Sequence, residues 1–268
     1  MLGRWLPRRL DHGEEATLVE HLDEFRSRLI IALFAIVPAF ALTFAFHERI
    51  MEWLTGPLPD NKKLVTLGVV EPFTVSVKVS LIAAIAITLP VILWQVWAFL
   101  APAVDPHFQR VILGFVVLAT ALFVLGVLFM YYIVLPRALD FLTSYDDNIY
   151  DIQIRASYYY SFAALTLLAG GLGFLMPIFV LALVRLRVLT TRRMRSNRSI
   201  AYVLLLVFAI LLPTVDPVSL VFETIPLLIL FEASIWMAKV MEPRWHSGLS
   251  ILEEYEAEHA DDSEATLP

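Results

Sequence analysis

The sequence predicts an all-α integral membrane protein with six transmembrane helices and both termini in the cytoplasm. Of its 268 residues 59% are hydrophobic and only 17% are charged, whereas soluble domains average about half and about a quarter. The mean hydropathy is +0.74. Six apolar runs follow one another along the chain, and a helix needs roughly 20 such residues to cross the hydrocarbon core.

The expected spans are Leu29–Phe46, Phe73–Leu100, Val111–Leu135, Ser157–Val184, Ile200–Leu212 and Val218–Val240. We expect the fifth and sixth to be short and to form a tight hairpin, because only five residues separate them. At 1.5 Å per residue, the fifth run covers only about 20 Å.

These runs divide the chain into three parts. Residues 1–28 form an N-terminal cytoplasmic segment with an amphipathic helix, and residues 29–240 form the membrane domain. Residues 241–268 form an acidic cytoplasmic tail, expected to be largely disordered because it is charged and poor in apolar residues.

The distribution of Lys and Arg predicts the orientation. With six spans, 14 of these residues lie on the side of the termini and five on the opposite side, while Lys78 lies within the second span. Cytoplasmic loops carry the excess of positive charge, so both ends are expected in the cytoplasm.

The N-terminal segment contains a capping-box pattern at Thr17 and Glu20, which predicts the start of a helix. Glu24 and Arg28 follow at the spacing of an i,i+4 ion pair. Two interpretations stay open: an interfacial helix that anchors the topology, or a docking surface with an exposed carboxylate. On the other side of the membrane, residues 47–72 are expected to fold into a packed cap with short helices.

Several residues in or near the spans are candidates for special roles. Ionisable groups at membrane depth are costly and often functional, so Glu232, placed near the middle of the sixth span, is the clearest candidate. Gln95 and Asp216 are further candidates for polar or partner contacts within the membrane. We assign structural roles to Pro57 and Pro177.

Patterns typical of enzymes do not occur. The chain has no cysteine, its six histidines are scattered, and no metalloprotease, nucleophile-elbow or P-loop motif is found. The glycines at positions 170, 171 and 173 lie inside an apolar run and indicate close helix packing. We expect no enzyme, no metal or other cofactor, and no nucleic-acid partner.

Four motifs in order resemble the TatC family, the polytopic core subunit of the twin-arginine protein translocase. His21–Leu29 reads HLDEFRSRL, similar to the family's H-L-x-E-L-R-x-R-L. Pro90–Pro102 reads PVILWQVWAFLAP, close to the family's exit from the second span. Leu211–Ser219 resembles the T-P-P-D-x-x-S turn, and Pro226–Glu232 resembles P-L-x-x-L-[YF]-E.

The resemblance implies a Sec-independent translocase subunit of the plasma membrane that recognises twin-arginine signal peptides of folded cargo. It implies a homo-oligomeric receptor complex in the lipid membrane, with single-span TatA- and TatB-type partners and transport driven by the proton-motive force. By position, it assigns signal-peptide binding to Glu24, Arg26, Arg28, Trp97, Phe99, Pro102, Phe108 and Arg110.

The chain departs from the family pattern at two acidic positions. Phe108 occupies the place of a glutamate that the family usually has in the first cytoplasmic loop, and Leu175 replaces a glutamate or glutamine of the fourth span. The chain is therefore identified as a divergent member or a paralogue with altered cargo. A secondary transporter or channel for small solutes is the alternative, although such proteins usually show internal repeats.

Overall fold

The computed structural model describes residues 18–59, 63–100, 109–146, 148–149, 152–185, 189–213 and 216–264. Within these ranges, side chains are described between residues 22 and 99 and between residues 113 and 241. All statements about contacts below concern these residues.

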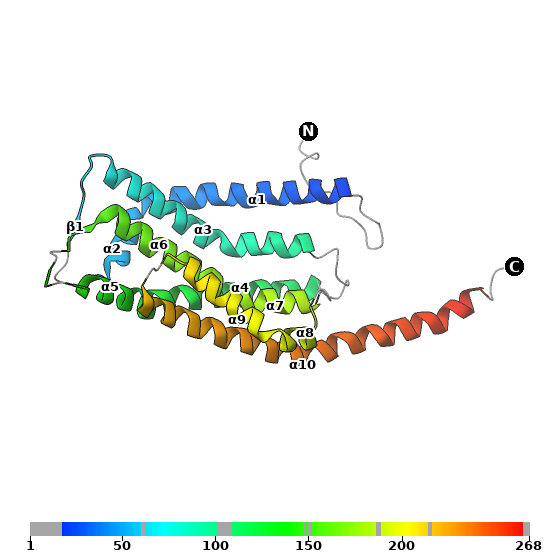
Figure 1. The fold of residues 1–268 in the computed structure, drawn as a ribbon. Coiled ribbons are helices and arrows are strands. Elements are labelled where there is room, and N and C mark those ends of the chain that lie inside the picture. The colour runs from blue at the N-terminus through cyan, green and yellow to red at the C-terminus, as the bar shows by residue number, and fades with distance from the viewer. Residues whose placement is uncertain are drawn as a thin grey trace, which may run out of the picture.

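Long helices run back and forth in an elongated bundle (Figure 1). Its helical elements are α1 (Leu18–Ala45), α2 (His47–Thr55), α3 (Glu71–Leu100), α4 (Gln109–Phe129), η4 (Met130–Val134), α5 (Leu135–Ser144), α6 (Ala156–Gly173), α7 (Met176–Arg185), α8 (Thr191–Ser196), α9 (Arg198–Leu211) and α10 (Pro217–Glu264). We call the end where α1 begins and α8 lies the terminal end, and the end with α2 and α5 the cap end. The tail of α10 leaves the bundle at the terminal end (Figure 1).

Five described segments are long and apolar enough to cross a membrane: Leu22–Ala45, Glu71–Phe99, Leu113–Ser144, Ala156–Arg185 and Pro217–Met241. A shorter apolar helix, α9, has 14 residues, so the expectation of a short fifth run is confirmed. The expectation of a short sixth span is wrong, because the apolar part of α10 has 25 residues.

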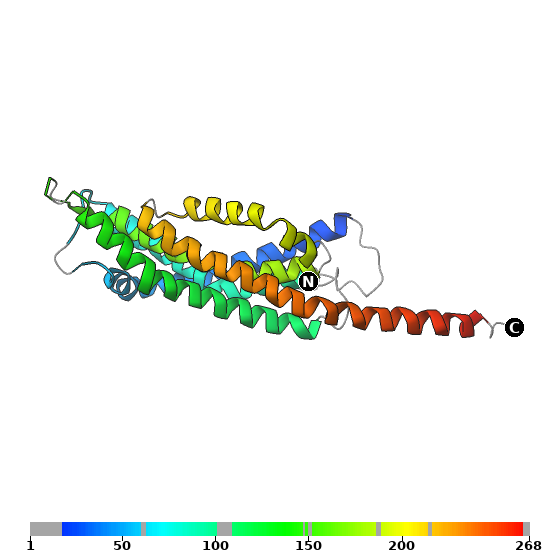
Figure 2. The ribbon, with the colours of Figure 1, turned by 60° about the horizontal axis from the view of Figure 1, so that its bottom comes forward.

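The third span also extends further than predicted. Helices α4 and α5 are joined without a break by η4, a π-helical turn that ends two residues before Pro136. Proline lacks an N–H and disturbs a regular α-helix, and π turns commonly interrupt α-helices at such places. Helix α5 therefore occupies part of what the sequence suggested was an outside loop, and it runs beside α10 (Figure 2).

The tail after residue 241 is described as backbone only, to Glu264. Its backbone continues α10 as a helix to Glu264. Several Glu residues and few β-branched residues in the tail favour a helix locally.

The expectation of a packed cap is confirmed. Strands β1 (Leu64–Val65) and β2 (Ile154–Arg155) pair in parallel and connect the two outer segments. Two tyrosine hydroxyls donate hydrogen bonds of 2.7 Å to backbone carbonyls of helix α2. Tyr131 donates to Trp53, and Tyr159 donates to Leu54. The rings of Trp53 and Tyr131 also stack with centroids 4.1 Å apart. Pro57 follows in the turn directly after α2.

The fourth span consists of two helices, since α6 ends at Gly173 and α7 begins at Met176. Pro177 is the second residue of α7, where a missing N–H is tolerated, and it is fully buried. The predicted close packing of the glycines is confirmed. A Cβ on Gly171 would lie 2.7 Å from Cε2 of Phe123 in α4, and one on Gly170 would overlap Met130.

Candidate functional site

The start of α1 and the end of α3 come together at the terminal end. The rings of Phe25 in α1 and Phe99 in α3 meet edge to face with centroids 5.5 Å apart. Such aromatic pairs add to the stabilisation from burial alone. The two rings are 74 positions apart in the chain and belong to two of the four motifs that resemble the TatC family. Their contact therefore joins these two motifs in one surface.

Glu24 and Arg28 form the predicted ion pair on this surface. One carboxylate oxygen of Glu24, Oε1, accepts hydrogen bonds from Nε of Arg28 at 2.9 Å and from Nη2 at 2.5 Å. The other oxygen, Oε2, is buried and accepts no hydrogen bond from any described residue. The side chain of Glu24 is only 13% exposed, so the expected exposed carboxylate is not found, although Oε2 keeps an unused capacity for a charge-assisted bond.

The remaining predicted residues of the surface differ in their positions. Arg26 is exposed on α1, next to the ion pair. Trp97 is 5% exposed and packs on Phe115 of α4 with ring centroids 5.0 Å apart, so it supports the surface from within the core. Pro102 and Phe108 lie outside the described residues, and Arg110 is described only as backbone in the first turn of α4.

Phe25 is a member of this surface that the sequence analysis did not single out. The sequence feature that could have indicated it is an aromatic residue directly beside Glu24 in an amphipathic helix. That signal is weak, because exposed single apolar residues are common.

The predicted polar residues of the last two apolar helices have partners. Glu232 accepts a hydrogen bond from the hydroxyl of Tyr202 at 2.5 Å and forms an ion pair with Arg198 at 3.2 Å. Because Arg198 is the first residue of α9, Glu232 lies opposite the start of that short helix. Asp216 is buried and accepts from the backbone N–H of Ser219 at 2.7 Å, which is the contact of a helix N-cap. Gln95 is partly buried in α3.

Polar contacts also stabilise the cap end. Nζ of Lys78 in α3 donates to the hydroxyl of Ser161 in α6 at 3.0 Å. Glu71 accepts from Nε of Arg155 at 3.0 Å and from the backbone N–H groups of Leu67 and Ser157. The hydrogen bond with Glu71 raises the pKa of Arg155 above its ordinary value. These contacts connect the outer segments to the bundle.

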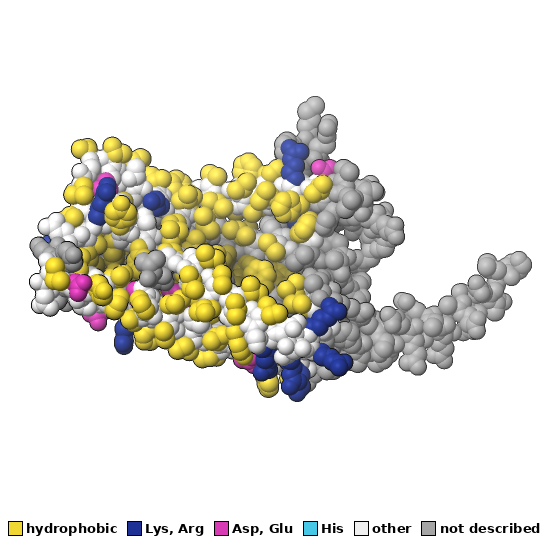
Figure 3. All heavy atoms as spheres, viewed as in Figure 1, with side chains coloured by type: hydrophobic (Ala, Val, Ile, Leu, Met, Phe, Trp, Pro, Cys, Tyr) yellow, Lys and Arg dark blue, Asp and Glu magenta, His cyan; other side chains and the backbone are white. Residues whose placement is uncertain are grey.

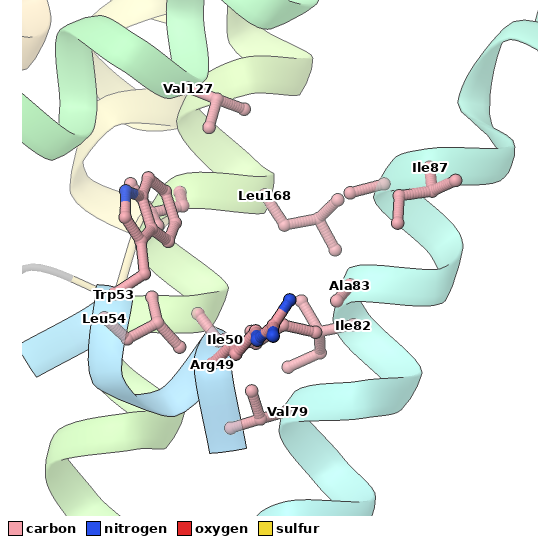
Figure 4. Close-up of a pocket in the computed structure, with 13 residues that line it drawn as sticks. Arg49, Ile50, Trp53, Leu54, Val79, Ile82, Ala83, Ile87, Val127 and Leu168 are labelled. Atoms are coloured by element: carbon pink, nitrogen blue, oxygen red, sulfur yellow. The ribbon is translucent and has the colours of Figure 1, made fainter. Parts of the chain in front are cut away.

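An apolar pocket of about 340 Å³ lies between α2, α3, α4 and α6. Arg49 supplies its charged group, and the side chain points from α2 toward α3 (Figure 4). The other lining residues are Ile50, Trp53, Leu54, Val79, Ile82, Ala83, Ala86, Ile87, Val127, Ala164, Leu167 and Leu168. The pocket suits an apolar chain more than a polar ligand. Among the described residues, no group of three or more His, Asp or Glu side chains is placed to hold a metal ion.

The fold and its exposed apolar belt define a multi-pass helical membrane protein (Figure 3). Comparison with known families matches residues 20–226 to the family described as Sec-independent protein translocase protein (TatC). The chain belongs to this family.

Individual relatives agree with that assignment. The chain is 35% identical over 236 residues to the TatC protein of Carboxydothermus hydrogenoformans, covering 87% of this chain and 96% of the relative. It is 35% identical to TatCd of Bacillus subtilis, with 84% and 92% covered. A crystal structure of the twin-arginine translocase receptor TatC superposes with a TM-score of 0.74 at 34% identity, covering 81% of this chain and 99% of that structure.

Proposed function

We propose that this translocase subunit recognises the twin-arginine signal peptides of folded cargo at the surface formed by α1 and α3. One acidic residue, Glu24, accepts a peptide arginine there, while Phe25 and Phe99 contact the neighbouring apolar side chains. The same surface includes Arg26, Arg28, Pro102, Phe108 and Arg110. The buried ring of Trp97 packs beneath it.

The observation that carries this proposal is the state of the Glu24 carboxylate. Its Oε1 is engaged by Arg28, which fixes the orientation of the group, while Oε2 lacks a described donor. Guanidinium and carboxylate groups form short, charge-assisted bonds that exceed those of neutral pairs. An arginine of a bound peptide would supply the missing donor.

Family membership supports our proposal for the rest of the transport cycle. The subunit works in the plasma membrane with both termini in the cytoplasm, as the Lys and Arg distribution favours. Several copies assemble with TatA- and TatB-type single-span partners, and the proton-motive force drives export. Family membership favours protein translocation over the small-solute transport that the sequence alone left open.

Export in living cells tests the proposal. Cells that lack their own TatC receive this chain together with its cognate single-span partners and a folded reporter with a twin-arginine signal. We expect export of this reporter and none of a matched reporter with a twin-lysine signal. Equal export of both reporters would contradict twin-arginine recognition.

A further inference from the structure

A basic hollow of about 530 Å³ lies at the terminal end, away from the α1–α3 surface. It is lined by Thr191, Arg192, Arg195, Ser196, Arg198 and Lys239, from α8, the start of α9 and α10. Lys and Arg side chains gather over α8 at the edge of the apolar belt (Figure 3). Three segments of the chain thus bring four cations to one place.

Most of this positive charge is not neutralised by the part of the protein that is described. Arg198 is paired with Glu232, and its Nε is buried without a described hydrogen-bond partner. No ion pair among the described residues engages Arg192, Arg195 or Lys239. A ligand for this hollow must therefore carry negative charge.

The surroundings of the hollow add a second requirement. Glu232, Trp236 and Lys239 share one face of α10 by helical spacing, and Trp236 is 68% exposed. Helix α9 also exposes Ile200 and Val203, although helical spacing places them on a different face of α9 from Arg198. Tryptophan is enriched where a membrane meets water. A ligand at this position therefore meets cations beside an exposed tryptophan of α10.

We propose that this basic hollow binds an anionic phospholipid, with the headgroup phosphate at Arg192, Arg195 and Lys239 and the acyl chains along α10 past Trp236. Basic pockets between transmembrane helices are suited to such headgroups. A soluble acidic peptide would satisfy the charge but would leave the exposed ring of Trp236 without an apolar partner. The site depends on the membrane location and not on signal-peptide recognition.

Native mass spectrometry of the purified, delipidated full-length chain tests this site. Phosphatidylglycerol and phosphatidylcholine with identical acyl chains are added in turn. We expect phosphatidylglycerol to be retained at least tenfold more strongly. Arg195→Gln and Lys239→Gln, which lie on different helices, should each weaken retention about fivefold, since a cation near such a headgroup contributes about 1 kcal/mol and 1.4 kcal/mol is tenfold.

The matched control is Arg193→Gln, which removes the same charge from the same short helix but does not line the hollow. It should change retention less than twofold. The proposal is overturned if Arg193→Gln weakens retention as much as Arg195→Gln, or if both lipids bind equally. Full competition by soluble glycerol phosphate, or tighter binding of an oligoglutamate peptide, would equally overturn a lipid ligand in favour of a free phosphate or a protein partner.

Discussion

Nε of Arg155 donates a hydrogen bond of 3.0 Å to Glu71, a residue 84 positions earlier in the chain. Glu71 is the first residue of α3, and Arg155 directly precedes α6. Backbone N–H groups of Leu67 and Ser157 donate to the same carboxylate at 3.0 and 3.1 Å. One side chain thus connects the β1 segment, α3 and α6 at the cap end.

Replacing Glu71 by Ala should loosen the cap, because it leaves one guanidinium and two backbone N–H groups without their acceptor. We expect the melting temperature in detergent to fall by about 5 °C, a typical response to the loss of a few favourable contacts in a protein of this size. Arg155→Gln should cost less, since both backbone donors remain paired. Glu52→Ala, on the exposed side of α2, is the control and should melt like the original chain.

Close packing between α4 and α6 makes a second prediction. A Cβ on Gly126 would lie 2.8 Å from Cβ of Phe174 and 3.0 Å from Cα of Gly171, whereas one on Gly114 meets nothing within 4 Å. Gly126→Ala should therefore destabilise the chain by about 1–3 kcal/mol through overpacking. Gly114→Ala, in the same helix, should be neutral or slightly stabilising. Equal unfolding curves for the two variants would show that the helices do not approach this closely.

Trp97 and Phe99 are expected to act differently although they are two positions apart. Trp97→Ala removes a buried ring that packs on Phe115 and should cost about 3–5 kcal/mol of stability. Phe99→Ala affects a partly buried ring at the surface, so it should weaken signal-peptide binding with a smaller effect on stability. Thermal unfolding and peptide titration of both variants separate these roles.

Periodicity and apolar runs were sufficient to predict the membrane helices, the packed cap and the short α9, because these features depend on local composition. The continuation of α5 past Pro136 was not predictable, since it depends on the π turn of η4. The sequence also did not reveal that Glu232 lies opposite the first turn of α9. The position of Glu232 relative to α9 depends on how α9 and α10 pack, which is not a local property of the sequence. The Phe25–Phe99 contact likewise joins residues far apart in the chain.

Phe108 provides a gain-of-function prediction, although it lies outside the described residues. The family usually has a glutamate at this place in the first cytoplasmic loop. A second carboxylate should add one charged hydrogen bond to a peptide arginine, and such bonds contribute about 1.5–3 kcal/mol. Phe108→Glu should therefore tighten twin-arginine peptide binding by at least about tenfold, while Phe108→Gln should have a smaller effect. An unchanged affinity would place residue 108 away from the bound arginines.

Titration of the purified receptor complex with a twin-arginine signal peptide tests the central claim most directly. The account predicts that Glu24→Gln weakens binding at least about tenfold, the loss expected for one charged hydrogen bond. Asp23→Asn, which removes the neighbouring exposed carboxylate, should leave the affinity unchanged, and a twin-lysine peptide should bind weakly to all three proteins. Equal affinities of the Glu24→Gln and Asp23→Asn variants for the twin-arginine peptide would contradict the account.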